Sequence, residues 1–416
     1  MSLPEADPRS LRGRLVRAGE ALSKQPHLGS IRDGVVGSLP LILLGSVFLL
    51  LAAPPWPGLA RFLPNVDALR MGTRACAGLV SIYACAATAL ALAKRRAADP
   101  AASVTTALSV FMLLQHPSPL AAGGLGLPIP QLGAGGLFPA FAAAIFAVET
   151  IAFFERRKWN IQLGGGAPDA VVRSFAALLP ATTCVLIVWT VVHVAGIDLA
   201  NVIGAIFAPL VRGSESLPAL VLVVLIDSSL YLVGVHPFSV LSAAKPIWLA
   251  QLADNMAAVA SGHPAHNLAT QEFFVWFVWQ GGSGGTLALA IQLLFAKSKQ
   301  LKLVGRAGFV PAVFNINEPL LFGVPVVLNG RLAVPFIVGP VVSVLLAYAA
   351  MKGGLVNVPS AEVVWTLPAP VGAFLSTGGD VRAVVLQMVN LVITSALWWP
   401  FVRRYDRVLL KAETVE

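Results

Sequence analysis

The sequence predicts an all-α integral membrane protein, and its composition, its apolar runs and the distribution of its basic residues each support this prediction. The chain has 416 residues, of which 57% are hydrophobic and 12% are charged, and its mean hydropathy is +0.79. A soluble globular domain carries roughly 25% charged residues. Apolar runs of about 20 residues recur, the length that a helix needs to cross a bilayer. Short basic loops separate these runs, and we predict about ten crossings from the alternation.

The net charge of +9 comes largely from such loops rather than from a surface that binds nucleic acid. Segment 1–32 is polar and basic, and no cleavable signal peptide is visible in it. Further basic groups follow apolar runs at 94–96, at 156–158 and in segment 403–416. Cytoplasmic loops of membrane proteins carry this excess of Lys and Arg, so both termini are predicted to be cytoplasmic. No soluble domain, repeat array or nucleotide-binding fingerprint is visible in the sequence.

The first half of the chain alternates regularly between apolar spans and polar loops. A loop rich in Gly and Pro is expected at 118–136, and a short amphipathic piece along the inner interface at 168–176. Cys76, Cys85 and Cys184 lack metal-ligand spacing and are predicted to be small packing residues. The predicted spans are 34–54, 72–93, 101–115, 137–154, 177–197, 218–236, 271–296, 332–351 and 382–402.

From about residue 200 this regular alternation decays. Segments 237–265, 308–330 and 366–380 are too short or too rich in Pro and Gly to cross the membrane cleanly. In transporters, discontinuous segments of this kind point to a substrate site near the middle of the bilayer. The run 308–325 is the most informative, because its three prolines and two glycines rule out one unbroken helix.

Three polar side chains, Asn315, Asn317 and Glu318, lie in the middle of that apolar run. An ionisable residue at membrane depth is costly and indicates a substrate or ion site. Carboxylate and amide oxygens accept hydrogen bonds, so the group suits a ligand rich in hydroxyls. We expect Glu318 to accept a substrate hydroxyl and to act as a base, the structural alternative being a carboxylate that only caps a helix.

Three further residues are candidates with open alternatives. His236 ends an apolar span, where its imidazole could bind a hydroxyl and move a proton, or simply bond a backbone carbonyl. Trp365 could stack on a sugar ring or belong to an interfacial aromatic belt. Asp227 could face a cavity and pair with a cation, or lie at the hydrated end of a span. His263 and His266 have no acid or cysteine cluster nearby, so no metal site is predicted.

Several motifs, spread over nearly the whole chain, resemble those of one transporter family. They are Val171–Phe175 leading to Leu179-Pro180, Gly234-Val235-His236, Phe273-Phe274 through Gly281–Thr286, Phe314-Asn315-Ile316-Asn317-Glu318-Pro319 with Phe322–Pro325, and Trp365-Thr366 with Pro368. The central run is similar to an Asn-Ile-Asn-Glu-Pro signature. On these motifs the chain is identified as a member of the IIC components of the lactose/cellobiose/diacetylchitobiose phosphotransferase systems.

The resemblance implies a IIC-type permease fold with two re-entrant hairpins, in a homodimer embedded in the bacterial inner membrane. Segment 33–200 would form the scaffold, and segment 201–402 would bind a β-linked disaccharide and carry it across by an elevator-like movement. A separate IIB protein, supplied by IIA, would phosphorylate the 6-hydroxyl, so the chain takes part in phosphotransfer and needs no cofactor. The implied catalytic residues are Glu318 and His236. The implied sugar-binding residues are Asn315, Asn317, Glu318, His236, Trp365, Thr366, Gly282 and Ser283.

The chain departs from the family pattern at three positions. Pro237 stands in place of a glycine, where it fixes one backbone dihedral and removes a hydrogen-bond donor. Val275 stands in place of an acid, and Val364 stands in place of a proline. These departures leave room for a facilitator or ion-coupled symporter that moves sugar without phosphorylation. An enzyme acting on lipid-linked sugar would need more acids or a metal, and a sensor would not require hydroxyl-binding groups inside broken helices.

Overall fold

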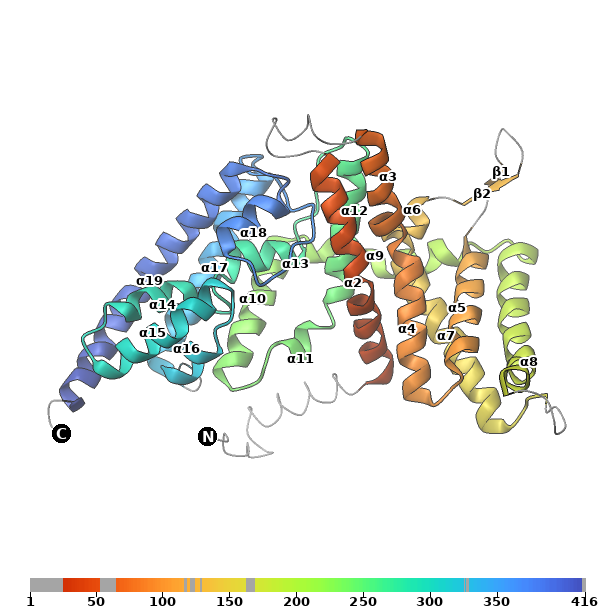
Figure 1. Cartoon of the computed structure of the whole chain (residues 1–416), viewed down its shortest axis with the longest axis horizontal. Helices are drawn as coiled ribbons and strands as arrows, with labels where there is room; N and C mark the ends of the chain where they lie inside the picture. Colours follow the sequence, from red (N-terminus) through yellow and green to blue (C-terminus); the bar gives the residue numbers. More distant parts are fainter. Residues whose placement is uncertain are drawn as a thin grey trace.

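The computed structural model describes residues 25–52, 65–115, 118–119, 124–127, 129–161, 169–324, 326 and 329–413. Its described part is helical apart from one antiparallel strand pair, β1 (Ser118–Pro119) with β2 (Leu125–Gly126) (Figure 1), so the predicted all-α class is confirmed. The helices are α2 (Pro26–Ala52), α3 (Val66–Cys76), α4 (Val80–Arg96), α5 (Pro100–Leu114), α6 (Ile129–Leu132), α7 (Leu137–Arg157), α8 (Asp169–Trp189), α9 (Leu199–Ser214), α10 (Leu217–Leu232), α11 (Phe238–Leu241), α12 (Lys245–Ala260), α13 (Gln271–Phe273), α14 (Thr286–Leu294), α15 (Lys299–Val313), α16 (Glu318–Gly323), α17 (Gly330–Lys352), α18 (Ala369–Ser376) and α19 (Val381–Glu413).

Membrane-spanning helices dominate this architecture. Among the described residues, 6 helical stretches are long and apolar enough to cross a membrane, or up to 7 if the bent pair α9–α10 counts as one span. The two helices of that pair meet at 79°. The stretches are Pro26–Ala52, Val66–Arg96, Ala134–Arg157, Val171–Val194, Arg331–Lys352 and Val381–Glu413.

One predicted boundary in the first half of the chain is wrong. The amphipathic piece at 168–176 is not separate, since α8 runs on through Pro180 to Trp189 and ends in a π turn, Thr190–Val194. Membrane helices tolerate an internal proline because their surroundings satisfy the freed backbone groups. The helix that contains the last predicted span, 382–402, continues beyond it to Glu413 as α19.

The extra length of α19 is used to hold the start of α15. The Asp406 carboxylate accepts the backbone N–H groups of Lys297 and Ser298, at 2.8–3.1 Å. Two turns later, Glu413 accepts from the Ser298 hydroxyl and from the N–H groups of Lys299 and Gln300. Carboxylates stabilise a helix N-terminus through its unpaired N–H groups and its dipole. The basic segment after residue 402 is therefore partly a structural helix.

The predicted span 271–296 is broken in its middle. α13 passes into a π turn, Phe274–Val278, and the chain then crosses a glycine-rich loop before α14 begins at Thr286. Gly281, Gly282, Gly284 and Gly285 all have positive φ. Glycine adopts this left-handed backbone without steric cost, whereas other residues seldom do. The four glycines thus form a turn in the middle of the predicted span.

The helices pack in two groups, one formed by α2–α8 and one by α10–α19 (Figure 1). α4, α5, α7 and α8 share a core of mainly small side chains that includes Cys85 and Cys184, both fully buried. α12 packs its apolar face on α2 and joins the groups. One polar contact also crosses here, from the Glu362 N–H to the Ser46 hydroxyl, at 2.8 Å.

Candidate functional site

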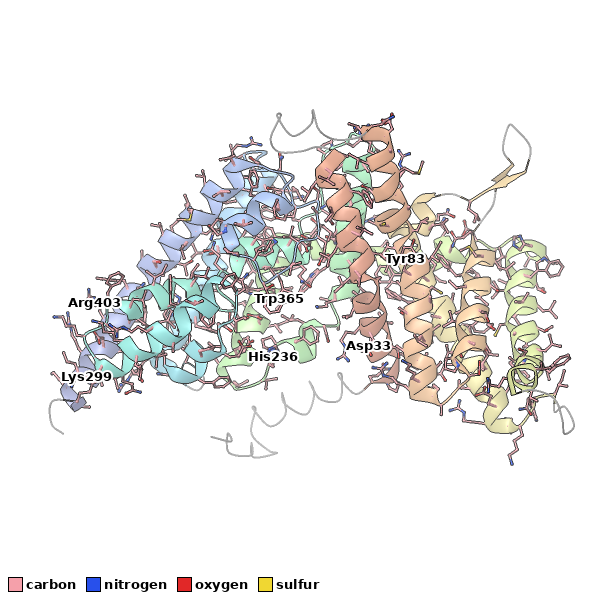
Figure 2. The ribbon with its side chains drawn as sticks, viewed as in Figure 1. Asp33, Tyr83, His236, Lys299, Trp365 and Arg403 are labelled. Atoms are coloured by element: carbon pink, nitrogen blue, oxygen red, sulfur yellow. The ribbon has the colours of Figure 1, made fainter. Side chains whose placement is uncertain are left out.

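A cavity of about 420 Å³ lies on the side of the second helix group, and Figure 2 shows His236 and Trp365 near the middle of the molecule there. Seven of the eight predicted sugar-site residues line it, whereas Thr366 does not. The lining residues are Asp227, Tyr231, His236, Pro237, Phe238, Leu241, Lys245, Trp248, Gln271, Val275, Trp279, Gly282, Ser283, Asn315, Asn317, Glu318 and Trp365.

Asn315 occupies the sharp turn between α15 and α16. Its φ of +61° is left-handed, a conformation that asparagine tolerates better than most residues. Its side-chain oxygen accepts the Gly281 N–H at 2.9 Å, and its amide nitrogen donates to the carbonyls of Trp365 and Leu367 at 2.8 and 3.2 Å. Both amide protons are used, so Asn315 joins three segments of the cavity wall.

Asn317 and Gly282 fit against each other below the cavity. Asn317 is 3% exposed, and its amide donates to the Ser283 carbonyl at 3.0 Å. Gly282 has a φ of +100°, and a Cβ added there would lie 2.5 Å from the Asn317 Cγ. Glycine is required at position 282 both by the backbone conformation and by this close approach.

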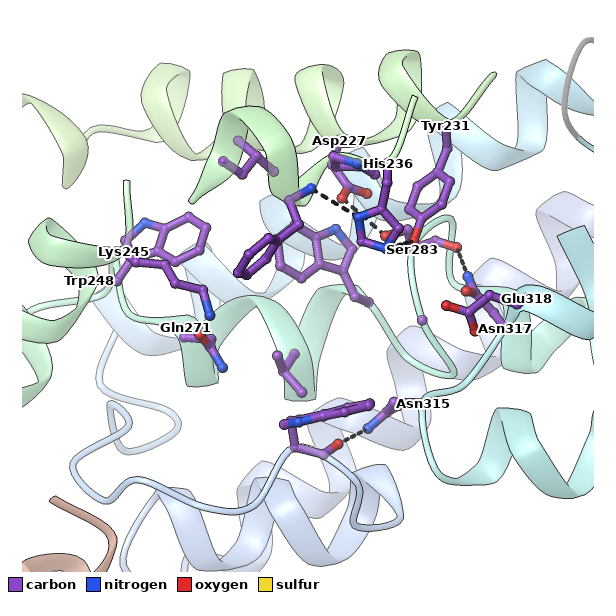
Figure 3. A pocket seen from close by; sticks show the side chains of 17 residues that line it. Asp227, Tyr231, His236, Lys245, Trp248, Gln271, Ser283, Asn315, Asn317 and Glu318 are labelled. Atoms are coloured by element: carbon purple, nitrogen blue, oxygen red, sulfur yellow. Dashed lines mark hydrogen bonds between the residues drawn. The ribbon is translucent and has the colours of Figure 1, made fainter. Parts of the chain in front are cut away.

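Glu318 is the first residue of α16 and is followed by Pro319, which suits the first turn of a helix. Its side chain is exposed to the cavity, and it accepts no hydrogen bond from the described residues. In Figure 3 it lies with Asn317 at the same end of the cavity as Tyr231 and Ser283. A carboxylate placed in this way can accept a hydroxyl proton from a ligand.

His236 follows the end of α10 and is held by two contacts. Its Nδ1 accepts the Phe238 N–H at 3.2 Å, and its Nε2 lies 3.1 Å from the Tyr231 hydroxyl. The first contact leaves Nε2 as the protonated nitrogen of a neutral ring. Pro237 starts the short α11 with a φ of −59°. The imidazole accepts the N–H of Phe238, so the missing N–H of Pro237 does not affect this contact.

Asp227 faces the cavity, which decides between the two alternatives that the sequence leaves open. The side chain is 4% exposed, and its Oδ1 accepts the Ser283 hydroxyl at 3.0 Å. Tyr231 follows four residues later on the same face of α10, with Asp227 and His236 near it in Figure 3. The acidic end of the cavity thus contains two carboxylates, Asp227 and Glu318.

The opposite end of the cavity is aromatic and basic. Figure 3 shows Lys245, Trp248 and Gln271 there, and the Lys245 ammonium lies 4.7 Å from the centre of the Phe238 ring. Trp248 and Trp279 both contact the Phe274 ring, with centroids 5.1 Å apart in each case. Trp365, whose carbonyl accepts the Asn315 amide, is 48% exposed and also lines the cavity. Flat aromatic faces such as these suit the apolar face of a sugar ring.

The comparison with known proteins decides the family. A family model described as "Phosphotransferase system, EIIC" matches residues 32–340. The chain belongs to this EIIC family. The cellobiose-specific EIIC component of Geobacillus stearothermophilus is 33% identical over 425 residues, which cover 96% of this chain and 94% of that protein. The lactose-specific EIICB component of Lacticaseibacillus casei is 30% identical, with 95% of this chain and 70% of that protein covered.

A solved structure agrees with this EIIC assignment. The crystal structure of ChbC, the IIC component of the N,N'-diacetylchitobiose-specific phosphotransferase system, matches with a TM-score of 0.88 at 33% identity. The match covers 98% of this chain and 99% of that one. The predicted family is confirmed, as is the IIC-type fold. This chain is therefore a multi-pass membrane sugar permease of the EIIC type.

Part of the lining of this EIIC cavity is not predicted by the sequence motifs. Tyr231, Lys245, Trp248 and Trp279 all line it, and none is singled out by a motif. Helical spacing could have indicated some of them. Asp227 and Tyr231 are four residues apart on α10, and Lys245 and Trp248 are three residues apart on α12, so each pair lies on one face of its helix. Val275, where related sequences are expected to have an acid, also lines the cavity.

Proposed function

We propose that this EIIC permease binds a β-linked disaccharide of the cellobiose, lactose or diacetylchitobiose type in the cavity between His236 and Trp365. One observation carries the proposal: the same cavity is lined by carboxylates that accept hydrogen bonds, Asp227 and Glu318, and by the tryptophans Trp248, Trp279 and Trp365. Its volume of about 420 Å³ is within the range of small-molecule sites, roughly 300–1,000 Å³. The names of the cellobiose-, lactose- and diacetylchitobiose-specific relatives support this substrate class.

We further propose that Glu318 and His236 prepare the 6-hydroxyl of the sugar for phosphorylation. The hydroxyl oxygen attacks phosphorus of a phosphocysteine on a IIB protein, so that an O–P bond forms and the S–P bond breaks. The hydroxyl proton passes to the Glu318 carboxylate, and the cysteine leaves as a thiolate. His236, held by Tyr231, orients the attacking oxygen through its Nε2. Positioning and proton transfer are what a protein contributes to phosphoryl transfer.

The phosphoryl donor in this proposal is a separate IIB chain, recharged by a IIA protein. The lactose-specific relative supports a IIB partner, because it is named as an EIICB component and extends beyond the part that this chain matches. The chain itself supplies the path and the site.

The architecture that goes with this function has about ten crossings and two re-entrant hairpins. We propose that the turn at 314–317 and the segment before α18 form the tips of these hairpins. Segment 33–200 is the scaffold of a homodimer, and segment 201–402 moves against it in an elevator-like step. The start of α2 and the end of α19 lie along one edge of Figure 1, which supports two cytoplasmic termini in a bacterial inner membrane.

The proposal is tested by uptake of labelled cellobiose, lactose and diacetylchitobiose into vesicles that contain the permease. Each sugar is supplied with and without the soluble phosphotransfer proteins and phosphoenolpyruvate. We expect one of them to accumulate as its phosphate only with the complete relay, and Glu318→Gln to abolish this. Glu155→Gln, at the far end of α7, is the matched control and should retain uptake.

Two other outcomes have a clear meaning. Equilibration of unmodified sugar without the relay would identify a facilitator, and accumulation that follows an ion gradient would identify a symporter. Failure of all three sugars to move would contradict the proposed substrate class.

A further inference from the structure

Asp227 is a buried carboxylate in the cavity wall, and neither the family motifs nor the proposed phosphoryl transfer uses it. It lies on α10, five residues before the helix end, and is 4% exposed. Its Oδ1 accepts the Ser283 hydroxyl at 3.0 Å. Its Oδ2 is buried and has no hydrogen-bond partner among the described residues.

A buried carboxylate oxygen without a donor is unfavourable, because folding removes it from water and gives nothing in return. No described Lys or Arg side chain forms an ion pair with Asp227, and Lys245 lies at the opposite end of the cavity. Polar groups inside membrane proteins are rare and usually mark a substrate or ion pathway. The missing donor is therefore expected to come from a bound ligand.

Ser283 places this oxygen close to the rest of the acidic end. Its hydroxyl donates to Asp227, while its carbonyl accepts the amide of Asn317, the residue before Glu318. One residue of the glycine-rich loop thus links the two carboxylate-bearing elements. Figure 3 shows Asp227, Ser283 and Glu318 at the same end of the cavity. A sugar ring that reaches one carboxylate is positioned to reach the other.

We propose that Asp227 is a specificity-determining residue, whose Oδ2 accepts a hydrogen bond from a secondary hydroxyl of the bound sugar. The hydroxyl belongs to the same ring as the 6-hydroxyl at Glu318. This inference rests on the proposed function, since it assumes that a disaccharide occupies the cavity. A site with a buried, otherwise unpaired acceptor rejects an analogue that lacks the donor. The permease therefore requires a free hydroxyl on that ring besides the one that becomes phosphorylated.

The competing explanation is purely structural: Asp227 would only fix the glycine-rich loop to α10 through Ser283. The two explanations predict different combined effects of removing a sugar hydroxyl and removing the Asp227 carboxylate. If Asp227 contacts one hydroxyl, removal of that hydroxyl and removal of the carboxylate have overlapping effects. If Asp227 only holds the loop, a mutation weakens the binding of every analogue by the same factor.

The test measures binding of cellobiose and its monodeoxy analogues to the full-length permease by isothermal titration calorimetry. The analogues lack the 2-, 3- or 4-hydroxyl of the ring that is phosphorylated, or one secondary hydroxyl of the other ring. We expect one analogue of the first set to bind the wild type about tenfold or more weakly than cellobiose. In Asp227→Ala this difference should shrink to less than about threefold.

Asp227→Asn serves as a second variant, because it is nearly isosteric and keeps an oxygen for Ser283. Its thermal unfolding midpoint is recorded first, and it should remain folded with the Ser283 contact in place. Equal losses for all analogues in both variants, or discrimination that persists in Asp227→Ala, would overturn the inference and leave the proposed function intact. Absence of binding of any disaccharide to the wild type would overturn both.

Discussion

The side-chain amide of Asn315 donates to the backbone carbonyl of Trp365 at 2.8 Å, across fifty positions of the sequence. The same side chain accepts the Gly281 N–H, so one residue connects the turn before α16, the glycine-rich loop and the segment before α18. These are the three irregular segments that carry Glu318, Ser283 and Trp365. Their relative positions, and with them the shape of the cavity, depend on one amide group.

We expect Asn315→Asp to weaken both the fold and the site. A carboxylate has no protons for the carbonyls of Trp365 and Leu367, and each hydrogen bond that is lost costs about 0.5–1.5 kcal/mol. Thermal unfolding followed by tryptophan fluorescence should show a lower midpoint, and cellobiose titration should show an affinity about tenfold lower, corresponding to about 1.4 kcal/mol.

Asn329→Asp is the matched control. The Asn329 oxygen accepts the Arg331 N–H at the start of α17, a role that a carboxylate keeps. The free energy of unfolding should change by less than about 0.5 kcal/mol. Equal effects of the two substitutions would show that the amide protons of Asn315 are not what matters.

Gly282→Ala should destabilise the protein by about 3 kcal/mol or more, which combines a strained left-handed alanine with overpacking. The added methyl would lie 2.5 Å from the Asn317 side chain and would push it off the Ser283 carbonyl. Gly378→Ala provides the comparison, since φ is +71° there and no atom lies within 4 Å of the added Cβ. That variant should lose only about 1–2 kcal/mol. Denaturant titration of both purified variants measures the difference in their free energies of unfolding. That difference should vanish if the close approach of Gly282 to Asn317 is unimportant.

Tyr231→Phe should slow sugar phosphorylation about threefold to tenfold, because His236 loses the hydroxyl that fixes its Nε2. The removed hydrogen bond is worth about 1 kcal/mol. Tyr83→Phe also deletes a tyrosine hydroxyl, one that donates to the Ala75 carbonyl at 2.7 Å in the first helix group. The rate of sugar-phosphate formation with the complete relay is measured for both variants. It should fall in Tyr231→Phe and stay unchanged in Tyr83→Phe. A normal rate in Tyr231→Phe would remove Tyr231 from the mechanism.

Trp365→Ala should lower sugar affinity about tenfold, since stacking on an aromatic face is worth about 0.5–1.5 kcal/mol beyond the buried area. Trp365→Phe should retain most of it. Trp399 is an equally exposed tryptophan, at 49% against 48%, but it lies on α19 beside Arg403 and outside the cavity. Trp399→Ala should therefore bind cellobiose normally. Parallel titrations of the three variants check this, and a loss in Trp399→Ala would point to a general effect of surface tryptophans.

Hydropathy predicts the regular spans well because a bilayer imposes one length on them. α2, α7 and α17 lie close to their predicted positions. Hydropathy fails where a segment is apolar but not one straight helix. The hydropathy of 271–296 does not distinguish a continuous helix from a π turn followed by a glycine-rich loop. Four closely spaced glycines were the available signal, and only backbone geometry shows that they turn the chain.

The candidate site was predictable in part for a related reason. Polar residues stand out against an apolar run, so Glu318 and Asn317 are visible in the sequence. The direction in which a side chain points is not visible in a sequence, so the sequence leaves the role of Asp227 open and gives no sign that Asn315 bonds Gly281, Trp365 and Leu367. Thr366 matches a motif but lies outside the cavity lining, in the turn that Trp365 and Thr366 form before α18.

The left-handed glycines also bear on how this permease could evolve toward new sugars. Alanine at Gly281, Gly282 or Gly284 would bring a methyl within 2.6 Å of neighbouring atoms, so this wall of the cavity admits almost no variation. The helical wall has no such restriction, and Val275, Gln271 and Lys245 project from it toward the ligand space. New substrate preferences are thus expected to arise by substitutions along one wall of the cavity while the other wall stays fixed.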